Sequence, residues 1–216
     1  MVTRVARAAV VLLLVLGVSF GALVALLEHP STKGPTRCWL QESLYGQSWE
    51  DAPAGTPVVE AMGVTEAVRD MCDAADDPAI LVSEAGAFVL GTNKQRSLNI
   101  YDLDGTLVAR ADDLGAPNNV DLRLLLGRAI AAASDKDGAE IEVFTIDQAT
   151  GEPTVIEGAP FSARAEDEIY GICLYKADEA LFVFTTDKSG LIVQYELKET
   201  DKSASLTEMR ALRVDS

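Results

Sequence analysis

The chain contains very little histidine and cysteine, and this restricts the chemistry open to it. His29 is its only histidine and lies in a linker-like stretch, so a catalytic centre built on Ser, His and Asp, or on Cys and His, is excluded. The three cysteines, Cys38, Cys72 and Cys173, show no CxxC spacing for a metal and cannot all pair within one chain. A Cys38–Cys72 disulfide is open to a chain outside the cytoplasm, whereas Cys173, in YGICLY, is predicted to be a buried strand residue. The sequence also has no P-loop, no GxGxxG motif and no zinc spacing.

Basic residues are scarce as well. The sequence has 18 Lys and Arg against 34 Asp and Glu, a formal charge of −16 at pH 7. This charge argues against nucleic acid or an anionic membrane surface as a partner. It suits a protein that works with divalent cations, and it is equally explained as a means of staying soluble.

One long apolar run is present, at residues 8–27, behind Arg4 and Arg7. Basic residues followed by an apolar run are the layout of an export signal, and 20 apolar residues also suffice to span a bilayer. No clear small-x-small cleavage site follows, so residues 1–27 are either a cleaved signal peptide or a membrane anchor with an apolar helix. In both cases the rest of the chain is predicted to be exported, either extracellular or periplasmic, or anchored and facing outside. Residues 28–63 show no period and are a linker or lead-in.

From about residue 75 the sequence repeats itself. Aligning Tyr101, Phe144 and Tyr195 superimposes LNIYDLDG, IEVFTIDQATG and LIVQYELKETD, at spacings of 43 and 51 residues. Each is preceded by a run that ends in Asn-Lys or Asp-Lys, namely FVLGTNK, IAAASDK and FVFTTDK. Four short apolar runs per unit at this spacing predict an all-β fold of about twelve antiparallel strands in three β-propeller blades, which is part of a ring. A two-sheet sandwich would explain the strands but not the recurring lysines.

The stretch CDAADDPAIL raises a separate question, because Asp73, Asp76 and Asp77 crowd together before an apolar run. Pro78 argues against a helix, since the residue before a proline is driven to extended geometry. The sequence therefore predicts that Asp77 lies in a turn, with a strand beginning near Ala79.

Two kinds of side chain recur at equivalent positions of the three units. Lysines follow the second strand of each unit, and they are expected at one rim, where ammonium groups bind phosphate. Oxygen donors open each unit and suit a hard cation: Asp76, Asp77, Asn118, Asn119, Asp121, Asp167 and Glu168. Together these predict a site for a polyanion held through Ca²⁺, and the alternative is that the acids only cap turns and pair with the lysines.

Several motifs in series now resemble a known family. DAADDPAI, GTNK, YDLDG, NNVD, AAASDK, EIYGICLY and TDKSGLIVQYEL are similar, in order and spacing, to the N-terminal half of β-propeller phytases, over residues 64–216. The resemblance implies about three four-stranded blades of a six-bladed fold. It also implies calcium-dependent hydrolysis of phytate (myo-inositol hexakisphosphate) by a phosphoric monoester hydrolase of the 3-phytase type.

Carried over residue by residue, the resemblance also implies a site. Its calcium ligands would be Asp76, Asp77, Asn119 and Asp121, and its substrate-binding side chains would be Lys94, Lys136, Tyr170 and Lys188. Three positions depart from the family pattern: Lys136 replaces an arginine, Gln95 a lysine and Ser189 an acid. The role of Arg123 is left open.

Two functions from different classes fit this sequence. One is a truncated or N-terminal part of a phytase, weak or inactive alone because the family's later calcium ligands are missing. The other is a non-catalytic half-propeller that binds phosphate and calcium and associates with another propeller or a second copy. Both predict apolar faces on the first and last blades, and hence a marginal chain that aggregates or self-associates.

Overall fold

The computed structural model describes residues 55–57, 59–70, 74–200 and 203–214. The predicted export segment at residues 1–27 and two cysteines, Cys38 and Cys72, lie outside the described residues. Within the described residues, no helix is long and apolar enough to cross a membrane. Contacts divide the chain into two units, Met1–Val58 and Val59–Ser216, and the fold below is that of the second.

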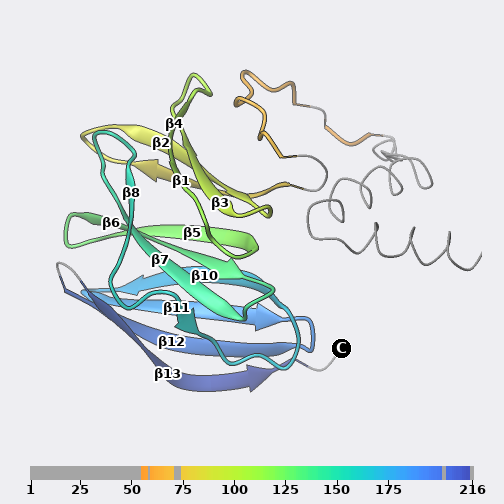
Figure 1. Ribbon diagram of the computed structural model, residues 1–216, viewed down its shortest axis with the longest axis vertical. Helices are drawn as coiled ribbons and strands as arrows, with labels where there is room; N and C mark the ends of the chain where they lie inside the picture. The colour runs from red at the N-terminus through yellow and green to blue at the C-terminus, as the bar shows by residue number, and fades with distance from the viewer. Residues whose placement is uncertain (1–54, 58, 71–73, 201–202, 215–216) are drawn as a thin grey trace, which may run out of the picture. The chain divides into compact units, whose positions relative to one another are not determined.

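The described residues form three antiparallel sheets that are stacked in chain order (Figure 1). Blade 1 consists of β1 (Ala75–Val82), β2 (Ala87–Asn93), β3 (Ser97–Tyr101) and β4 (Leu107–Ala111). Blade 2 consists of β5 (Pro117–Leu125), β6 (Arg128–Asp135), β7 (Glu140–Ile146), β8 (Pro153–Val155) and the short β9 (Phe161–Ser162), which pairs with β7. Blade 3 consists of β10 (Ile169–Ala177), β11 (Ala180–Asp187), β12 (Leu191–Glu199) and β13 (Ala204–Arg213). This is the predicted all-β, three-blade architecture, with β9 as one strand more than the twelve expected.

The three blades share one register. We call the first strand of each blade, β1, β5 or β10, its inner strand. The first residue of each inner strand pairs with the last residue of the second strand: Ala75 with Asn93, Pro117 with Asp135, and Ile169 with Asp187. In these strands, a residue of blade 1 is therefore equivalent to the residue 42 positions later in blade 2, and that residue to the one 52 positions later in blade 3. The predicted alignment of Tyr101, Phe144 and Tyr195 is confirmed, because these residues pair with Val89, Ala131 and Val183 at equivalent places.

The predicted turn at Asp77 is wrong. Asp76, Asp77 and Pro78 lie inside β1, which begins at Ala75 rather than near Ala79. β1 is an edge strand of its sheet. Pro78 has no backbone N–H to donate to a neighbouring strand, and a proline is tolerated better at a sheet edge than in a central strand. A β-bulge between Ala75 and Pro78 shifts the register, and β5 and β10 have a bulge at the same place.

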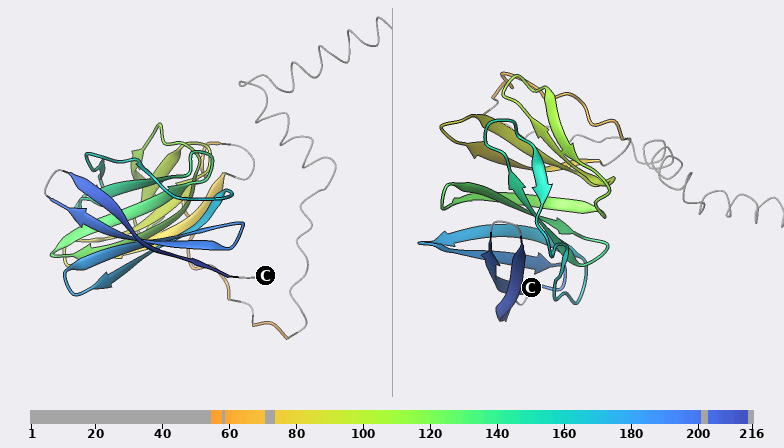
Figure 2. Two further views of the ribbon diagram at one scale, coloured as in Figure 1. Left: turned by 90° about the horizontal axis from the view of Figure 1, so that it is seen from below. Right: turned by 60° about the vertical axis from the view of Figure 1, so that its left-hand side comes forward.

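The core lies between blades rather than within one. One cluster joins Leu81, Leu90 and Ile100 of blade 1 to Leu122 and Phe144 of blade 2. A second cluster joins the opposite face of blade 2 to blade 3 through Ile130, Val143, Leu174, Val183 and Tyr195. The three inner strands are neighbours, since β5 contacts β1 and β10, and the right-hand view of Figure 2 shows the same order of sheets. Each blade therefore needs a neighbour to bury its apolar face.

The prediction that Cys173 is buried is wrong. Cys173 lies in β10 as expected, but its side chain is exposed. Its equivalent in blade 1 is Ala79, which is buried because blade 2 covers it. No described residue covers this face of blade 3, so the thiol faces outward.

Candidate functional site

The three recurring lysines occupy equivalent turns at one rim of the stack. The backbone N–H of Lys94 donates to the carbonyl of Ala74 at 2.8 Å. Lys136 and Lys188 make the same contact, with Ala116 and Glu168, each at 3.2 Å. These contacts link the end of the second strand to the residue that precedes the inner strand, so the three lysines occupy equivalent positions in the three turns.

The side chain of the residue before each lysine stabilises the turn itself. Asn93, Asp135 and Asp187 are buried, and each accepts a hydrogen bond from the backbone N–H two residues later. Burial alone would raise the pKa of Asp187, but the Ser189 hydroxyl and the backbone N–H groups of Glu166, Leu191 and Asp167 lower that pKa to about 2. This half of the recurring Asn-Lys or Asp-Lys pair is therefore structural.

Two of the lysines pair with carboxylates from the element that opens the same blade. In blade 1 the Nζ of Lys94 lies 3.2 Å from the Oδ1 of Asp76. In blade 3 Lys188 pairs with Glu168 and lies 5.0 Å from the centroid of the Tyr170 ring. The hydrogen bond from Lys188 lowers the pKa of Glu168, and the same bond raises the pKa of Lys188. Lysine–carboxylate pairing at the rim, the alternative raised by the sequence, is thus present in two of the three blades.

Lys136 differs from the other two lysines. It has no ion-pair partner among the described residues, although its charge contributes to the lowered pKa of Glu168. Lys136 of blade 2 and Lys188 of blade 3 therefore both lower the pKa of the Glu168 carboxylate. This electrostatic interaction links the rims of the two blades.

The predicted cation ligand Asp77 connects two blades. Its Oδ2 accepts the backbone N–H of Val120 in β5 at 3.2 Å. Its own N–H donates to the hydroxyl of Thr92 at 3.0 Å, and that hydroxyl in turn donates to the carbonyl of Asn118 at 2.5 Å. Asp77 and Thr92 therefore hold the inner strand of blade 2 against blade 1.

A similar contact links blade 2 to blade 3. The buried Asn118 donates through Nδ2 to the Oδ1 of Asn119 at 2.7 Å and to the carbonyl of Tyr170 at 2.9 Å. Asp121 accepts the N–H of Leu174 through Oδ2 at 2.8 Å. Its Oδ1 accepts from Arg123 at 2.5 Å, which gives that arginine a role the sequence left open.

These donors fit a hard cation only in part. Carboxylate and carboxamide oxygens are the ligands that Ca²⁺ prefers, and Asp76, Asp77, Asn119 and Asp121 all lie near the start of an inner strand. Within the described residues, however, no three His, Cys, Asp or Glu side chains are grouped as metal ligands. Both oxygens of Asp121 already accept hydrogen bonds, so a cation would have to share or displace Arg123.

The sequence-based prediction of this rim missed one contributor, a hydroxyl, and did not assign Glu168 to a particular lysine. Thr92 precedes Asn93, and Ser134 and Thr186 precede the equivalent aspartates, so a hydroxyl recurs one position before each pair. That signal was readable in TNK, SDK and TDK. The pairing of Glu168 with Lys188 was not, because it depends on how the loop before β10 folds back onto the end of β11.

Comparison with known proteins gives both a family and relatives. The sequence pattern of the Phytase family matches residues 47–214. The chain is 37% identical over 158 residues to the 3-phytase of Bacillus subtilis (strain 168), a match that covers 67% of this chain and 41% of that protein. The chain thus spans about two fifths of this curated relative.

Among solved structures, a thermostable family-43 glycoside hydrolase matches 63% of this chain and 54% of its own, with 12% identity and a TM-score of 0.39. The β-propeller domain of Myceliophteria thermophila Cps50 (Swd1) matches 65% of this chain and 60% of its own, with 9% identity and a TM-score of 0.33.

Proposed function

The chain belongs to the Phytase family, and on this premise we propose that its lysine-bearing rim binds phytate or a related phosphorylated small molecule together with Ca²⁺. The proposed reaction is hydrolysis of a phosphate monoester, as in a 3-phytase. One observation carries the proposal beyond the family match: lysines recur at one rim in three equivalent turns, each beside the acid-bearing start of an inner strand.

The chemistry of the rim suits a polyanion. Lys94, Lys136 and Lys188 offer point positive charges to phosphate oxygens, and exposed Tyr170 lies beside Lys188. A phosphate must compete with Asp76 for Lys94 and with Glu168 for Lys188. A cation that drew those carboxylates away would leave the lysines to the phosphate, so cation and phosphate binding are expected to favour each other.

The residues proposed to hold calcium are Asp76, Asp77, Asn119 and Asp121. Bound Ca²⁺ would supply positive charge against the phosphate and lower the pKa of a coordinated water. The protein's own part is to fix the phosphate through the lysines and to hold the carboxylates at the bulge of β1 and just after that of β5. Because Asp121 already binds Arg123 and Leu174, we expect calcium binding to be weak in this chain and hydrolysis to be low or absent.

The second candidate is a binding module without catalysis. It is favoured by the same engagement of Asp121 and by the absence, within the described residues, of a cluster of three acidic ligands. In this reading the rim holds phosphate and cation but activates no water. Phosphate release assayed beside binding separates the two functions.

The test is calorimetric titration of phytate into the parent chain and into Lys188→Met, with calcium present. We expect phytate to bind Lys188→Met several-fold more weakly, because the variant removes a charge at the rim. Lys198→Met is the matched control, since Lys198 is also exposed and ion-paired, with Glu196, but lies in β12 away from the three rim turns. Equal affinity of Lys188→Met and the parent would contradict the proposal.

A further inference from the structure

Arg123 lies on the same face of β5 as Asp121, a residue proposed to hold the cation. The two residues are two positions apart in the strand, so their side chains point to one side of the sheet. That side faces blade 3, because Asp121 accepts the backbone N–H of Leu174 in β10 at 2.8 Å and Leu125 belongs to the core shared with blade 3. Arg123 therefore lies where two inner strands meet, beside an oxygen donor of the proposed cation site.

The guanidinium group of Arg123 is anchored through one nitrogen. Its Nη1 donates to the Oδ1 of Asp121 at 2.5 Å and to the carbonyl of Leu122 at 2.7 Å. Its Nε and Nη2 have no hydrogen-bond partner among the described residues. These two nitrogens form one edge of the planar group, and such an edge binds a phosphate through two parallel hydrogen bonds. Arg123 thus pairs with a carboxylate and still has an edge that suits a phosphate.

Asp121 is held in place by the backbone as well as by Arg123. Its Oδ1 also accepts the N–H of Leu122 at 2.7 Å, and its Oδ2 accepts the N–H of Leu174 at 2.8 Å. Both of these donors are fixed in β-strands, whereas the arginine reaches Asp121 through a long, flexible side chain. The ion pair is partly exposed, at 42% for the Arg123 side chain and 21% for that of Asp121. A pair as exposed as this contributes little to stability, so a cation can replace Arg123 at small cost.

Charge determines what happens when a divalent cation binds Asp121. The cation and the guanidinium group repel each other, so both cannot remain in contact with the Oδ1 of Asp121. The displaced Arg123 keeps its positive charge, and its donors are then all available. The oxygens of a phosphate bound to that cation match the fork of a guanidinium group in geometry and in charge.

We propose that Arg123 exchanges partners when ligands bind. It pairs with Asp121 in the cation-free chain, and it binds a phosphate group of the substrate when a cation takes its place at Asp121. Arg123 is then a substrate-binding residue that the cation makes available, and it couples the binding of the two ligands. This inference rests on the proposed function and assigns part of its coupling to one side chain. In the opposing account Arg123 is purely structural and only orients Asp121.

The test is calorimetric titration of the parent chain and of Arg123→Met, first with calcium alone and then with phytate in calcium or in chelator. Arg123→Met removes the group that competes with the cation, so calcium alone should bind the variant about two- to fivefold more tightly, the range of a partly exposed ion pair. Phytate in calcium should bind the variant about tenfold more weakly, because hydrogen bonds to a charged phosphate are lost. In chelator the difference in phytate affinity should be smaller, because the charge of Asp121 then cancels that of Arg123.

A structural role for Arg123 predicts the opposite change in calcium affinity. If Arg123 only orients Asp121, its loss misplaces a ligand, and calcium should bind Arg123→Met more weakly than the parent. Calcium binding that is weaker or unchanged, or equal phytate affinity of the two chains in calcium, overturns this inference and leaves the proposed function standing. A parent chain that binds neither calcium nor phytate overturns both.

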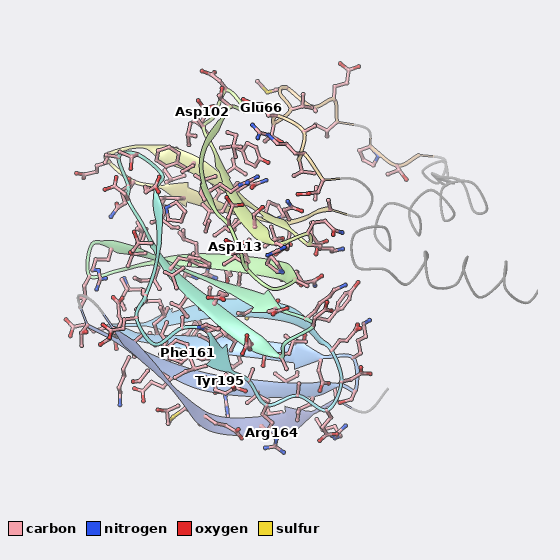
Figure 3. All side chains as sticks on the ribbon, viewed as in Figure 1. Glu66, Asp102, Asp113, Phe161, Arg164 and Tyr195 are labelled. Carbon is pink, nitrogen blue, oxygen red and sulfur yellow. The ribbon has the colours of Figure 1, made fainter. Side chains whose placement is uncertain are left out.

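Two further variants separate the fork from the charge and from general effects. Arg164→Met is the matched control, because Arg164 is also partly exposed and ion-paired, with Glu208 of β13 at 3.0 Å, but lies at the outer edge of blade 3 (Figure 3). It should bind both ligands as the parent does. Arg123→Lys keeps the charge without the fork, so it should bind calcium as the parent does and phytate in calcium more weakly. Circular dichroism checks folding, and if Arg123→Met is unfolded, phytate affinity of Arg123→Lys equal to the parent's overturns the inference.

Discussion

The carboxylate of Asp121 accepts a hydrogen bond from the backbone N–H of Leu174, 2.8 Å away on the inner strand of the next blade. A residue that the family resemblance implies as a calcium ligand therefore also holds two blades in register. Asp77 does the same between blades 1 and 2 through the N–H of Val120. Blade packing and any cation at this rim are thus linked through the same oxygens.

Removing this link should destabilise the fold. Asp121→Ala leaves the N–H of Leu174 without its acceptor and Arg123 without its ion pair, at a cost of about 1–3 kcal/mol in the free energy of unfolding. Urea denaturation measures this cost, with Asp104→Ala as the control, because Asp104 is exposed and its carboxylate has no hydrogen-bond or ion-pair partner among the described residues. Equal stability of the two variants would show that the inter-blade bond contributes nothing.

Acid should weaken the turn that carries Lys188. The pKa of Asp187 is about 2 in the folded protein, below its ordinary value of 3.8, so its charged form stabilises the fold above pH 4. That stabilisation is lost as pH falls from 4 through 2, where the carboxylate takes up a proton.

The comparison that isolates this effect is Asp187→Asn. We expect it to be less stable than the parent at pH 7 by about 2 kcal/mol, the order of hydrogen bonds to a charged group. The difference in unfolding free energy should shrink as pH falls from 4 toward 2. A difference that stays constant over that range would contradict the assignment of the low pKa.

Gly115 makes room for the side chain of Asp135, in the turn that carries Lys136. A Cβ on Gly115 would lie 1.9 Å from the Oδ2 of Asp135, whereas a Cβ on Gly63 would have no atom within 4 Å. Gly115→Ala should therefore lower the free energy of unfolding by about 1–3 kcal/mol through overpacking, and Gly63→Ala should change it little. Thermal unfolding of both variants checks this, and equal midpoints would mean that the turn adapts freely.

The lysine–carboxylate pairs should restrain phosphate binding when calcium is absent. Glu168→Gln releases Lys188 from its ion pair, so phytate should bind this variant about two- to fivefold more tightly than the parent in chelator, the range of an exposed pair. Glu196→Gln, which releases Lys198 in β12, is the control and should bind as the parent does. Weaker binding by Glu168→Gln would assign Glu168 to the ligand rather than to Lys188.

Much of this fold was predictable because the repeat is local. The alignment of Tyr101, Phe144 and Tyr195 and the three lysine turns follow from strand and turn patterns within each blade. The placement of Asp77 was not predictable in this way. Pro78 correctly indicated extended backbone, but only the position of β1 at the edge of a sheet makes that backbone a strand.

The candidate site was predictable by residue type rather than by contact. Asp76 beside Lys94 follows from the acids and lysines that open and end the first two strands of a blade. The contact of Asp121 with Leu174 joins residues 53 apart in different blades, and no local pattern encodes it. Cys173 was misassigned for a related reason: an apolar strand predicts burial, but the neighbouring blade decides which side of it is covered.

The most direct test of the central claim is calorimetric titration of phytate into the parent, Asp77→Ala and Asp121→Ala, each with calcium and with chelator. Urea denaturation first confirms that each variant is folded. The account predicts that the parent binds phytate only weakly without calcium and clearly more tightly with it, and that both variants lose the calcium-dependent part. Variants that bind as the parent does, or a parent that is indifferent to calcium, would contradict the assignment of this rim.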